Sequence, residues 1–480
     1  MEQQYSISEW PDADEIEEKM SRLMNDRIYH IRPEAMRRYM NYFDEKCMIS
    51  KAMTDEAKKY IPGGVQHNLA FNYPFPLAVR SADGPYLFDE DGNRYVDYLQ
   101  AGGPTILGSN YIPVQEKAIE VIRSCSPCTG LFNEYEMKLA KTVNKYMPWV
   151  EMFRSVASGT EADMVAIRAA RAYTGNKKII KVGSAYHGWS DQLVYSLHIP
   201  ETKRFEACGI PEECTANTQE VRNDDIEDLR RLLEANRQNG GTAGVLLEPV
   251  GPESGTRLVH HDYNKKVRAL CDEYGALLIF DEVVTGFRIG MGGAQGYFGV
   301  RPDITVFGKI VAGGYPAAGG IGGRREIMEC LSAGVALGKP RAYIGGTLSA
   351  NPLSCAAGHF AIEEIAETGA VVKAGINGDK LREGIQALVN EYHLPFVVWN
   401  IGSIVHFEVA GMMYISADNP KLAEELTERK DAVAEFGAAL TANGVITLAG
   451  SRIYTSMADN DETLKATLKA FEDVLSNIEK

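Results

Sequence analysis

Residues 276–284 read ALLIFDEVV, an apolar run of strand length that ends in two adjacent carboxylates. Short, continuous apolar runs of this kind are typical of strands buried on both faces of a sheet. Stretches with the spacing of amphipathic helices, at 161–173, 224–238 and 262–274, alternate with such runs. Four further runs complete the pattern: EMFRSVASG (151–159), KKIIKVGSAYHG (177–188), TAGVLLEPV (242–250) and DITVFGK (303–309). The alternation predicts an α/β fold in which helices cover both faces of a mostly parallel sheet.

The segments on either side predict a second, smaller domain. Residues 12–50 have the pattern of charged helices, 84–99 alternates like a β-hairpin around a turn, and strand-like residues 397–410 lie among helices of an α+β region. We therefore expect four segments: a helical extension (1–53), the first part of a small domain (54–114), a large domain (115–360) and the rest of the small domain (361–480).

Composition excludes several classes of function. The 480 residues contain 50 Lys and Arg against 65 Asp and Glu, a net charge of −15, which argues against a nucleic-acid partner. No apolar run reaches the roughly 20 residues of a membrane span, and the acidic N-terminus lacks the layout of a signal peptide. The eight cysteines are scattered, and CSPC (125–128) has no second pair to complete a zinc site. A cytoplasmic location with ordinary thiols is the expectation.

Polar and reactive residues follow the predicted strands where each strand ends. Ligands of open α/β sheets bind outside the carboxyl ends of the strands. We therefore expect the residues at these ends to lie at one edge of the sheet: Ser158-Gly159-Thr160, Tyr186-His187, Glu248, Asp281-Glu282 and Lys309.

The stretch SGTEA (158–162) predicts the start of a helix. Ser158 and Glu161 have the S-x-x-E spacing of a capping box, and the helical pattern that follows ends near Gly175. Free N–H groups and the positive end of the helix dipole could bind an anion such as phosphate beside Gly159. A capped helix with no ligand is the alternative.

Asp281 and Lys309 both need special surroundings. A buried Asp281 needs a partner, which could be a protonated ring nitrogen, an arginine or a helix N-terminus. Lys309 has no acidic neighbour in the chain between Asp303 and Glu326, and desolvation would free its amine to attack a carbonyl. A lysine that extends to water is the alternative. The glycines that follow would let the backbone approach a ligand closely: Gly313, Gly314, Gly319, Gly320, Gly322 and Gly323.

These features form a set that fits one cofactor. A phosphate cradle, a carboxylate for a pyridinium nitrogen and a lysine that forms a Schiff base are what pyridoxal 5′-phosphate (PLP) requires. No metal site is expected.

The motifs resemble those of the class III aminotransferases of PLP fold type I, and most closely the glutamate-1-semialdehyde aminomutase-like branch. The likeness runs from about residue 54 to the C-terminus and weakens after 365. It is carried by IPGGV (61–65), DGPYLFDEDGNRYVDY (83–98), SGTEADMVAIRAARAYTGNKKIIK (158–181), YHGWSD (186–191), LLEPV (246–250), FDEVVTGFR (280–288), FGKIVAGGYPAAGGIGGRREIME (307–329) and GGTLSANPLSCAAG (345–358).

The resemblance implies roles around the cofactor ring. Lys309 would form the aldimine with PLP and then carry the proton between the substrate carbon and the cofactor. Asp281 would pair with the ring nitrogen. Val283 would pack on one face of the ring and Tyr186 would stack on the other.

It also implies roles at the phosphate and the rim of the site. Residues Ser158, Gly159 and Thr160 would hold the phosphate, while Gly346 and Thr347 would reach the phosphate of a neighbouring subunit, which implies a homodimer with shared active sites. Glu248 is expected on the side of the cofactor's 3-hydroxyl, with His187 nearby.

The sequence departs from the aminomutase pattern at the expected substrate pocket. Gln66-His67-Asn68 stands where the aminomutases carry an arginine for the substrate carboxylate, and Gly102 stands where they carry a tryptophan. Arg452 replaces a glutamate motif and would either contact a substrate carboxylate or be an exposed charge. Gln66, His67, Gly102 and Arg452 are therefore the candidate substrate residues.

Three functions remain open at this point. The leading hypothesis is an aminotransferase that moves an amino group between an amino acid or amine and a keto acid or aldehyde, through pyridoxamine phosphate. The alternative is an isomerase, either an amino acid racemase or epimerase or an aminomutase, because the same lysine supports both. The third is a protein of this fold retained only for binding or regulation.

Overall fold

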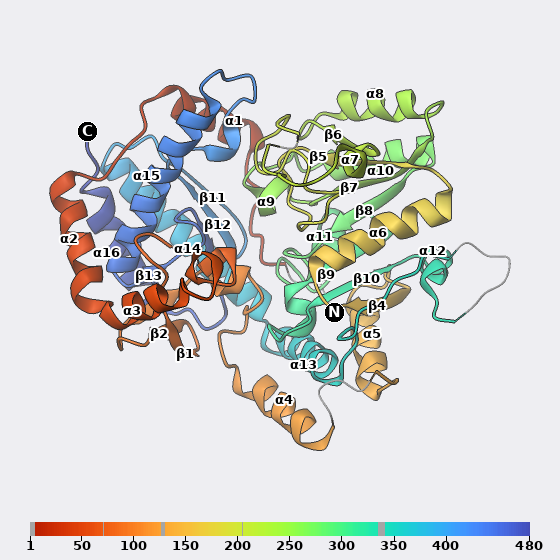
Figure 1. Ribbon diagram of the computed structural model, residues 1–480, viewed down its shortest axis with the longest axis horizontal. Helices are drawn as coiled ribbons and strands as arrows, with labels where there is room; N and C mark the ends of the chain where they lie inside the picture. Colours follow the sequence, from red (N-terminus) through yellow and green to blue (C-terminus); the bar gives the residue numbers. More distant parts are fainter. Residues whose placement is uncertain (1–4, 71, 126–129, 204, 335–340) are drawn as a thin grey trace. The chain divides into compact units, whose positions relative to one another are not determined.

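The computed structural model describes residues 5–70, 72–125, 130–203, 205–334 and 341–480, and these form two compact units (Figure 1). Of the described residues, the first unit contains Tyr5 and those between 112 and 369, and the second contains those between 6 and 111 and between 370 and 480. The chain thus leaves the second unit after residue 111 and returns to it at residue 370. The division into four segments suggested by the sequence stays a prediction.

A seven-stranded sheet forms the centre of the first unit, and all its strands except β10 run in the same direction. The five apolar runs of the sequence each contain one strand, which confirms the mostly parallel α/β fold. In spatial order the strands are β4 (Met152–Val156), β10 (Gly319–Gly323), β9 (Ile304–Gly308), β8 (Leu277–Asp281), β7 (Thr242–Leu247), β5 (Lys178–Val182) and β6 (Thr218–Val221).

Helix α6 (Gly159–Thr174) packs against β7, β9 and β10 and carries much of the core. Its alanines, among them Ala162, Ala166 and Ala170, are buried against the apolar side chains of the sheet, while Arg168 is exposed. The other helices of this unit are α4 (Ile112–Ser124), α5 (Glu134–Tyr146), α7 (Glu212–Thr215), α8 (Ile226–Asn236), α9 (Pro252–Gly255), α10 (Tyr263–Tyr274), α11 (Gly293–Phe298), α12 (Arg325–Met328) and α13 (Pro352–Thr368).

The second unit contains two smaller sheets. The predicted hairpin is confirmed, because β2 and β3 pair antiparallel in a sheet of order β1 (Val79–Asp83), β2 (Tyr86–Asp89), β3 (Arg94–Asp97) and β13 (Val445–Ile446). The second sheet contains β11 (Val397–Ile401), β12 (Ile404–Glu408) and β14 (Arg452–Tyr454). Its helices are α1 (Ala13–Asn25), α2 (Pro33–Lys46), α3 (Met48–Ala57), α14 (Ala370–Glu391), α15 (Leu422–Ala442) and α16 (Asp461–Leu475).

Strand β10, with the sequence GGIGG, corrects one expectation. Its four glycines were expected to make room for a ligand, but they lie inside the sheet between β4 and β9. A Cβ at Gly320 would lie 2.4 Å from the ring of Phe153, and one at Gly322 would lie 2.2 Å from Val150. The glycines are needed because neighbouring protein atoms fill the space that side chains would occupy.

Candidate active site

Four neighbouring parallel strands, β5, β7, β8 and β9, direct their carboxyl ends to the same edge of the sheet. Asp281 is the last residue of β8, Lys309 follows the last residue of β9, and Glu248 follows the last residue of β7. A loop after β5 carries Tyr186 and His187. The structure therefore brings the residues predicted from the strand ends to one edge.

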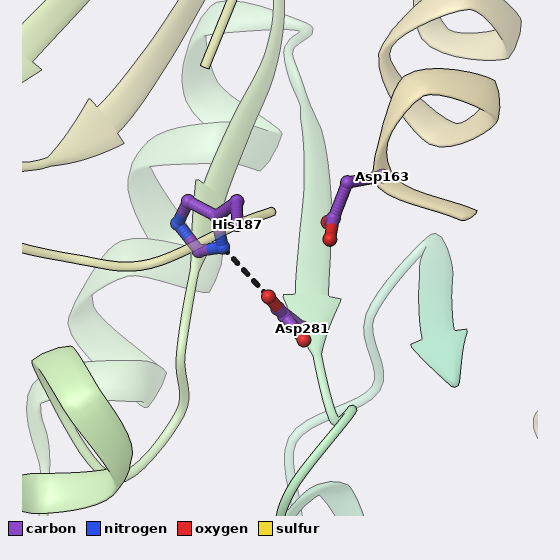
Figure 2. A group of neighbouring side chains, drawn as sticks. All are labelled: Asp163, His187 and Asp281. Carbon is purple, nitrogen blue, oxygen red and sulfur yellow. Dashed lines mark hydrogen bonds and ion pairs between the residues drawn. The ribbon is translucent and has the colours of Figure 1, made fainter. Parts of the chain in front are cut away.

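The carboxylate of Asp281 is hydrogen-bonded to His187. The Nδ1–H of His187 donates to Oδ2 of Asp281 over 2.7 Å, and the backbone N–H of Val283 donates to Oδ1 over 2.9 Å (Figure 2). Both side chains are buried, and burial lowers the pKa of His187, with the hydrogen bond to Asp281 opposing that shift. The imidazole is thus neutral near pH 7, and its one N–H orients the Asp281 carboxylate. Arginine pairing, one of the alternatives for Asp281, is not what the structure shows.

Lys309 lies in a strained position at the same edge. It begins a short 3₁₀ turn (Lys309–Ala312) with φ of 49°, a left-handed conformation that is uncommon for a residue with a side chain. Its side chain is partly exposed, and among the residues that the structure describes its ammonium has no hydrogen-bond or ion-pair partner. The amine is therefore available to a ligand.

Val283 lies between two glycines that bring it close to Lys309. A Cβ at Gly308 would lie 2.8 Å from Val283, and one at Gly159 would lie 3.0 Å from it. The absence of these two side chains allows the end of β9, the start of α6 and Val283 to pack together. This contact places an apolar surface next to Lys309, where the family resemblance expects a cofactor ring.

The start of α6 offers an anion site. The Ser158 side chain accepts from the N–H of Glu161, and Gly175, with φ of 71°, ends the helix, as predicted. The capping box is incomplete, because Glu161 accepts from the N–H of Ala157 and not from that of Ser158. The first N–H groups of a helix have no acceptor within it, and they carry its positive dipole.

Gly188 holds the loop after β5 against this helix start. Its φ is 77°, and a Cβ there would lie 2.3 Å from Oγ1 of Thr160. The loop that carries Tyr186 and His187 therefore fits against Thr160 only with a glycine at position 188.

Glu248 accepts backbone hydrogen bonds from the loop after β5 and from the short helix α9. Its carboxylate accepts from the N–H groups of Tyr186 (3.2 Å), Glu253 (2.8 Å) and Ser254 (2.7 Å). Burial, and then the charges of Glu253 and Asp281, raise the pKa of Glu248 to about 8. A role for Glu248 beside a cofactor hydroxyl stays a prediction, and its visible contacts are with the backbone. Tyr186 is 43% exposed and is therefore accessible to a ligand.

The predicted substrate residues belong to the second unit. Gln66 and His67 are exposed, and His67 Nδ1 accepts from the N–H of Leu69. Gly102 is buried with φ of 83°, so its backbone conformation also favours glycine. Arg452 is only 9% exposed, which rules out the interpretation of an exposed charge. Gly346 and Thr347, in the first unit, are exposed.

Two buried ionisable residues near the site were not predicted from the sequence. Asp163 lies in α6 and is 1% exposed, although the helical pattern gave no reason to single it out. Lys181, in β5, is fully buried and donates to the carbonyls of Ala185, Leu193 and Tyr195, which lie on both sides of Tyr186 and His187. The burial of Lys181 could have been predicted, because this lysine lies inside the apolar run IIKV.

Asp163, His187 and Asp281 form a compact group in which one N or O atom of each lies within 4.8 Å of the others (Figure 2). Two acids and a histidine are chemically able to bind a cation. His187 and Asp281 already share a hydrogen bond, which favours a cationic ring nitrogen beside Asp281 over a metal ion. The group, the amine of Lys309 and the start of α6 together fit PLP.

Known proteins share this architecture and these motifs. The family described as aminotransferase class-III matches residues 70–475. A glutamate-1-semialdehyde 2,1-aminomutase of Methanosarcina acetivorans is 38% identical over 431 residues, which cover 89% of this chain and 98% of that one. An omega-transaminase from Sphaerobacter thermophilus, 28% identical, has a TM-score of 0.80 over 91% of this chain and 99% of its own. A transaminase with PLP bound, 26% identical, has a TM-score of 0.79 over 90% and 97%.

Fold, site and relatives agree on the class of protein: an enzyme that depends on PLP. The chain belongs to the class III aminotransferase family, as its motifs indicated. It acts on small molecules, and none of its described helices has the length and apolar character needed to cross a membrane.

Proposed function

We propose that this enzyme is an aminomutase, which moves an amino group between adjacent carbons of a single small substrate. The observation that carries the proposal is the relative named glutamate-1-semialdehyde 2,1-aminomutase, which aligns over 98% of its own length at 38% identity. The aminomutase was the alternative hypothesis from the sequence, and this relative favours it over the aminotransferase. An α-amino aldehyde with a carboxylate is the corresponding substrate class.

The residues at the sheet edge supply what such a reaction needs. Bound PLP supplies an aldehyde that condenses with amines and a ring that accepts electrons from the adjacent substrate carbon. Lys309 would hold the cofactor through its amine and then move the proton at the reacting carbon. Asp281, oriented by His187, would face the ring nitrogen, and Val283 and Tyr186 would bound the ring. The start of α6, with Ser158, Gly159 and Thr160, would bind the phosphate.

An aminotransferase remains the second candidate because of specific differences in the expected substrate pocket. Residues Gln66, His67 and Asn68 contain no arginine for the substrate carboxylate. Arg452 is the other guanidinium considered for that role, and it is buried near Glu408, whose pKa burial raises to about 7 while the Arg452 charge opposes the shift. A different carboxylate position would favour a different substrate.

One assay separates the candidates. Purified holoenzyme is incubated with glutamate-1-semialdehyde alone, and with single amino acids in the presence and absence of 2-oxoglutarate. We expect the semialdehyde to be converted into its isomer, of identical mass, without any added amino acceptor, because amino and carbonyl groups exchange within one molecule. Amino-group transfer that requires 2-oxoglutarate would contradict the aminomutase and support the aminotransferase. Inversion of an amino acid without an acceptor would indicate a racemase.

We also propose a homodimer with shared active sites. Large apolar side chains of the first unit are exposed around the segment that contains Gly346 and Thr347, and they would be covered by a second copy. They are Leu131 (78%), Phe132 (77%), Tyr343 (78%) and Leu348 (53%).

Sedimentation equilibrium tests the dimer with a matched pair of variants. Tyr343→Asp is expected to weaken the dimer and lower PLP affinity, because it places a charge in the proposed interface. Tyr60→Asp changes a tyrosine of equal exposure, 78%, in the second unit and is expected to do neither. A wild-type protein that is monomeric and binds PLP fully would contradict the proposal.

A cytoplasmic location is the remaining proposal. It rests on the chemistry of the thiols, since seven of the eight cysteines lie in the described residues and all seven are free. Cys128 of the CSPC stretch lies outside the described residues.

A further inference from the structure

Asp163 is the third member of the group at the end of β8, and the proposed cofactor contacts do not use it. Figure 2 shows its carboxyl extending from α6 toward Asp281. The side chain is 1% exposed, and within the described part of the chain its Oδ1 has no hydrogen-bond partner. An unpaired buried acid is costly, so its presence beside the cofactor site calls for an explanation.

The surroundings of Asp163 favour its neutral form. Burial raises its pKa well above the ordinary value, and the charge of Asp281 raises it further, while Lys309 opposes both effects. His187 does not compensate, because burial keeps the imidazole neutral. Two carboxylates this close in a buried site cannot both ionise without a cation between them. Burial and the neighbouring carboxylate of Asp281 therefore favour the neutral form of Asp163.

We propose that Asp163 acts as a neutral acid that positions Asp281, confining the negative charge of this group to the carboxylate that faces the cofactor's ring nitrogen. A carboxylic acid beside Asp281 excludes water and can donate a hydrogen bond, which an ionised side chain cannot do. His187 and Val283 already fix the two oxygens of Asp281 by their N–H groups. Asp163 would complete the enclosure from the α6 side. The inference rests on the PLP assignment and not on the choice between aminomutase and aminotransferase.

The first test measures cofactor affinity without turnover. Cofactor-free protein is titrated with PLP and with its analogue in which a CH group replaces the ring nitrogen. Asp163→Ala should weaken PLP binding by about tenfold or more and weaken analogue binding much less, because only PLP uses Asp281. Asp163→Asn keeps the shape and stays neutral, so it should retain most of the preference for PLP.

Glu161→Gln is the matched control, since it changes a carboxyl two residues earlier, in the first turn of α6. It should affect PLP and the analogue equally, because both carry the phosphate. Equal losses for the two compounds in Asp163→Ala would reduce Asp163 to a packing role and overturn the proposal. Asp163→Asn behaving like Asp163→Ala would also overturn it. Failure of the wild-type protein to bind PLP would instead contradict the cofactor assignment.

The second test follows thermal unfolding of the cofactor-free protein from pH 5 to pH 8. The pKa of Asp163 is raised in the folded state, so between the unfolded and folded values the folded chain binds one proton more. Wild-type stability should therefore fall, relative to Asp163→Asn, as the pH rises, by up to about tenfold in the unfolding equilibrium per pH unit. A midpoint difference that stays constant over this range would show that Asp163 is already ionised and would overturn the proposal.

Discussion

Lys309→Ala is expected to abolish turnover while the protein still folds. The amine is the group that would hold PLP and carry the proton at the reacting carbon, and loss of positioned proton transfer alone typically costs roughly 10²- to 10⁴-fold. The cost to stability should be small, because the side chain is partly exposed and has no hydrogen-bond or ion-pair partner among the described residues. Alanine also meets the same backbone strain as lysine at φ of 49°. Turnover and thermal unfolding of the two proteins are the measurements.

Lys178→Ala provides the control for this variant. Lys178 lies in β5 at the opposite end of its strand from the site, and its ammonium donates to the carbonyl of Ala216. We expect that variant to turn over substrate at nearly the wild-type rate. Substantial turnover by Lys309→Ala would show that another amine holds the cofactor and would overturn the assignment of the site.

The parallel strands could be predicted because strands that are buried on both faces have nearly continuous apolar sequences. Runs such as TAGVLLEPV and ALLIFDEVV contain few polar residues before the strand ends, and the helices between them are amphipathic. The position of the site followed from the same pattern, because parallel strands bring their carboxyl ends together. Asp281, His187 and Lys309 could be predicted in this way, because each follows or ends one of these strands.

Strand β10 and Asp163 could not be predicted for a different reason. GGIGG has no apolar periodicity and low strand propensity, and it forms a strand through its pairing with β4 and β9, where Phe153 and Val150 occupy the space beside its glycines. Asp163 stands in a helix where a charged residue is normally exposed. Its burial depends on which elements α6 packs against, and local sequence does not specify that packing.

Asp281→Asn is expected to have the second-largest effect, because both oxygens of Asp281 act as acceptors. One accepts from His187 Nδ1–H and the other from the Val283 N–H. An asparagine has a single acceptor oxygen, so its NH₂ group would face one of these donors. His187 could respond only by moving its proton to Nε2, which is buried and without a partner within the described chain. An unsatisfied buried donor costs about 1–3 kcal/mol.

The cofactor would also lose the negative charge that faces its ring nitrogen. Together we expect a loss of about 2–4 kcal/mol in binding of PLP and of the transition state, roughly 30- to 1000-fold. Titration with PLP measures the loss of cofactor affinity, and steady-state turnover measures the loss of transition-state binding. Part of the loss comes from the change of tautomer at His187. We therefore expect His187→Ala to lower PLP affinity and turnover much less in the Asp281→Asn protein than in the wild type.

Glu282→Gln separates this electrostatic effect from damage to the fold. Glu282 is equally buried at the end of the same strand, and its oxygens accept from the N–H groups of Ala294 and Gln295 and from the Thr285 hydroxyl. Its replacement should lower the thermal midpoint, because a buried carboxylate with several donors becomes an amide, but it should change PLP affinity only a few-fold. If Glu282→Gln weakened PLP binding as much as Asp281→Asn, the loss would reflect disruption of this strand end. The assignment of Asp281 to the ring nitrogen would then be wrong.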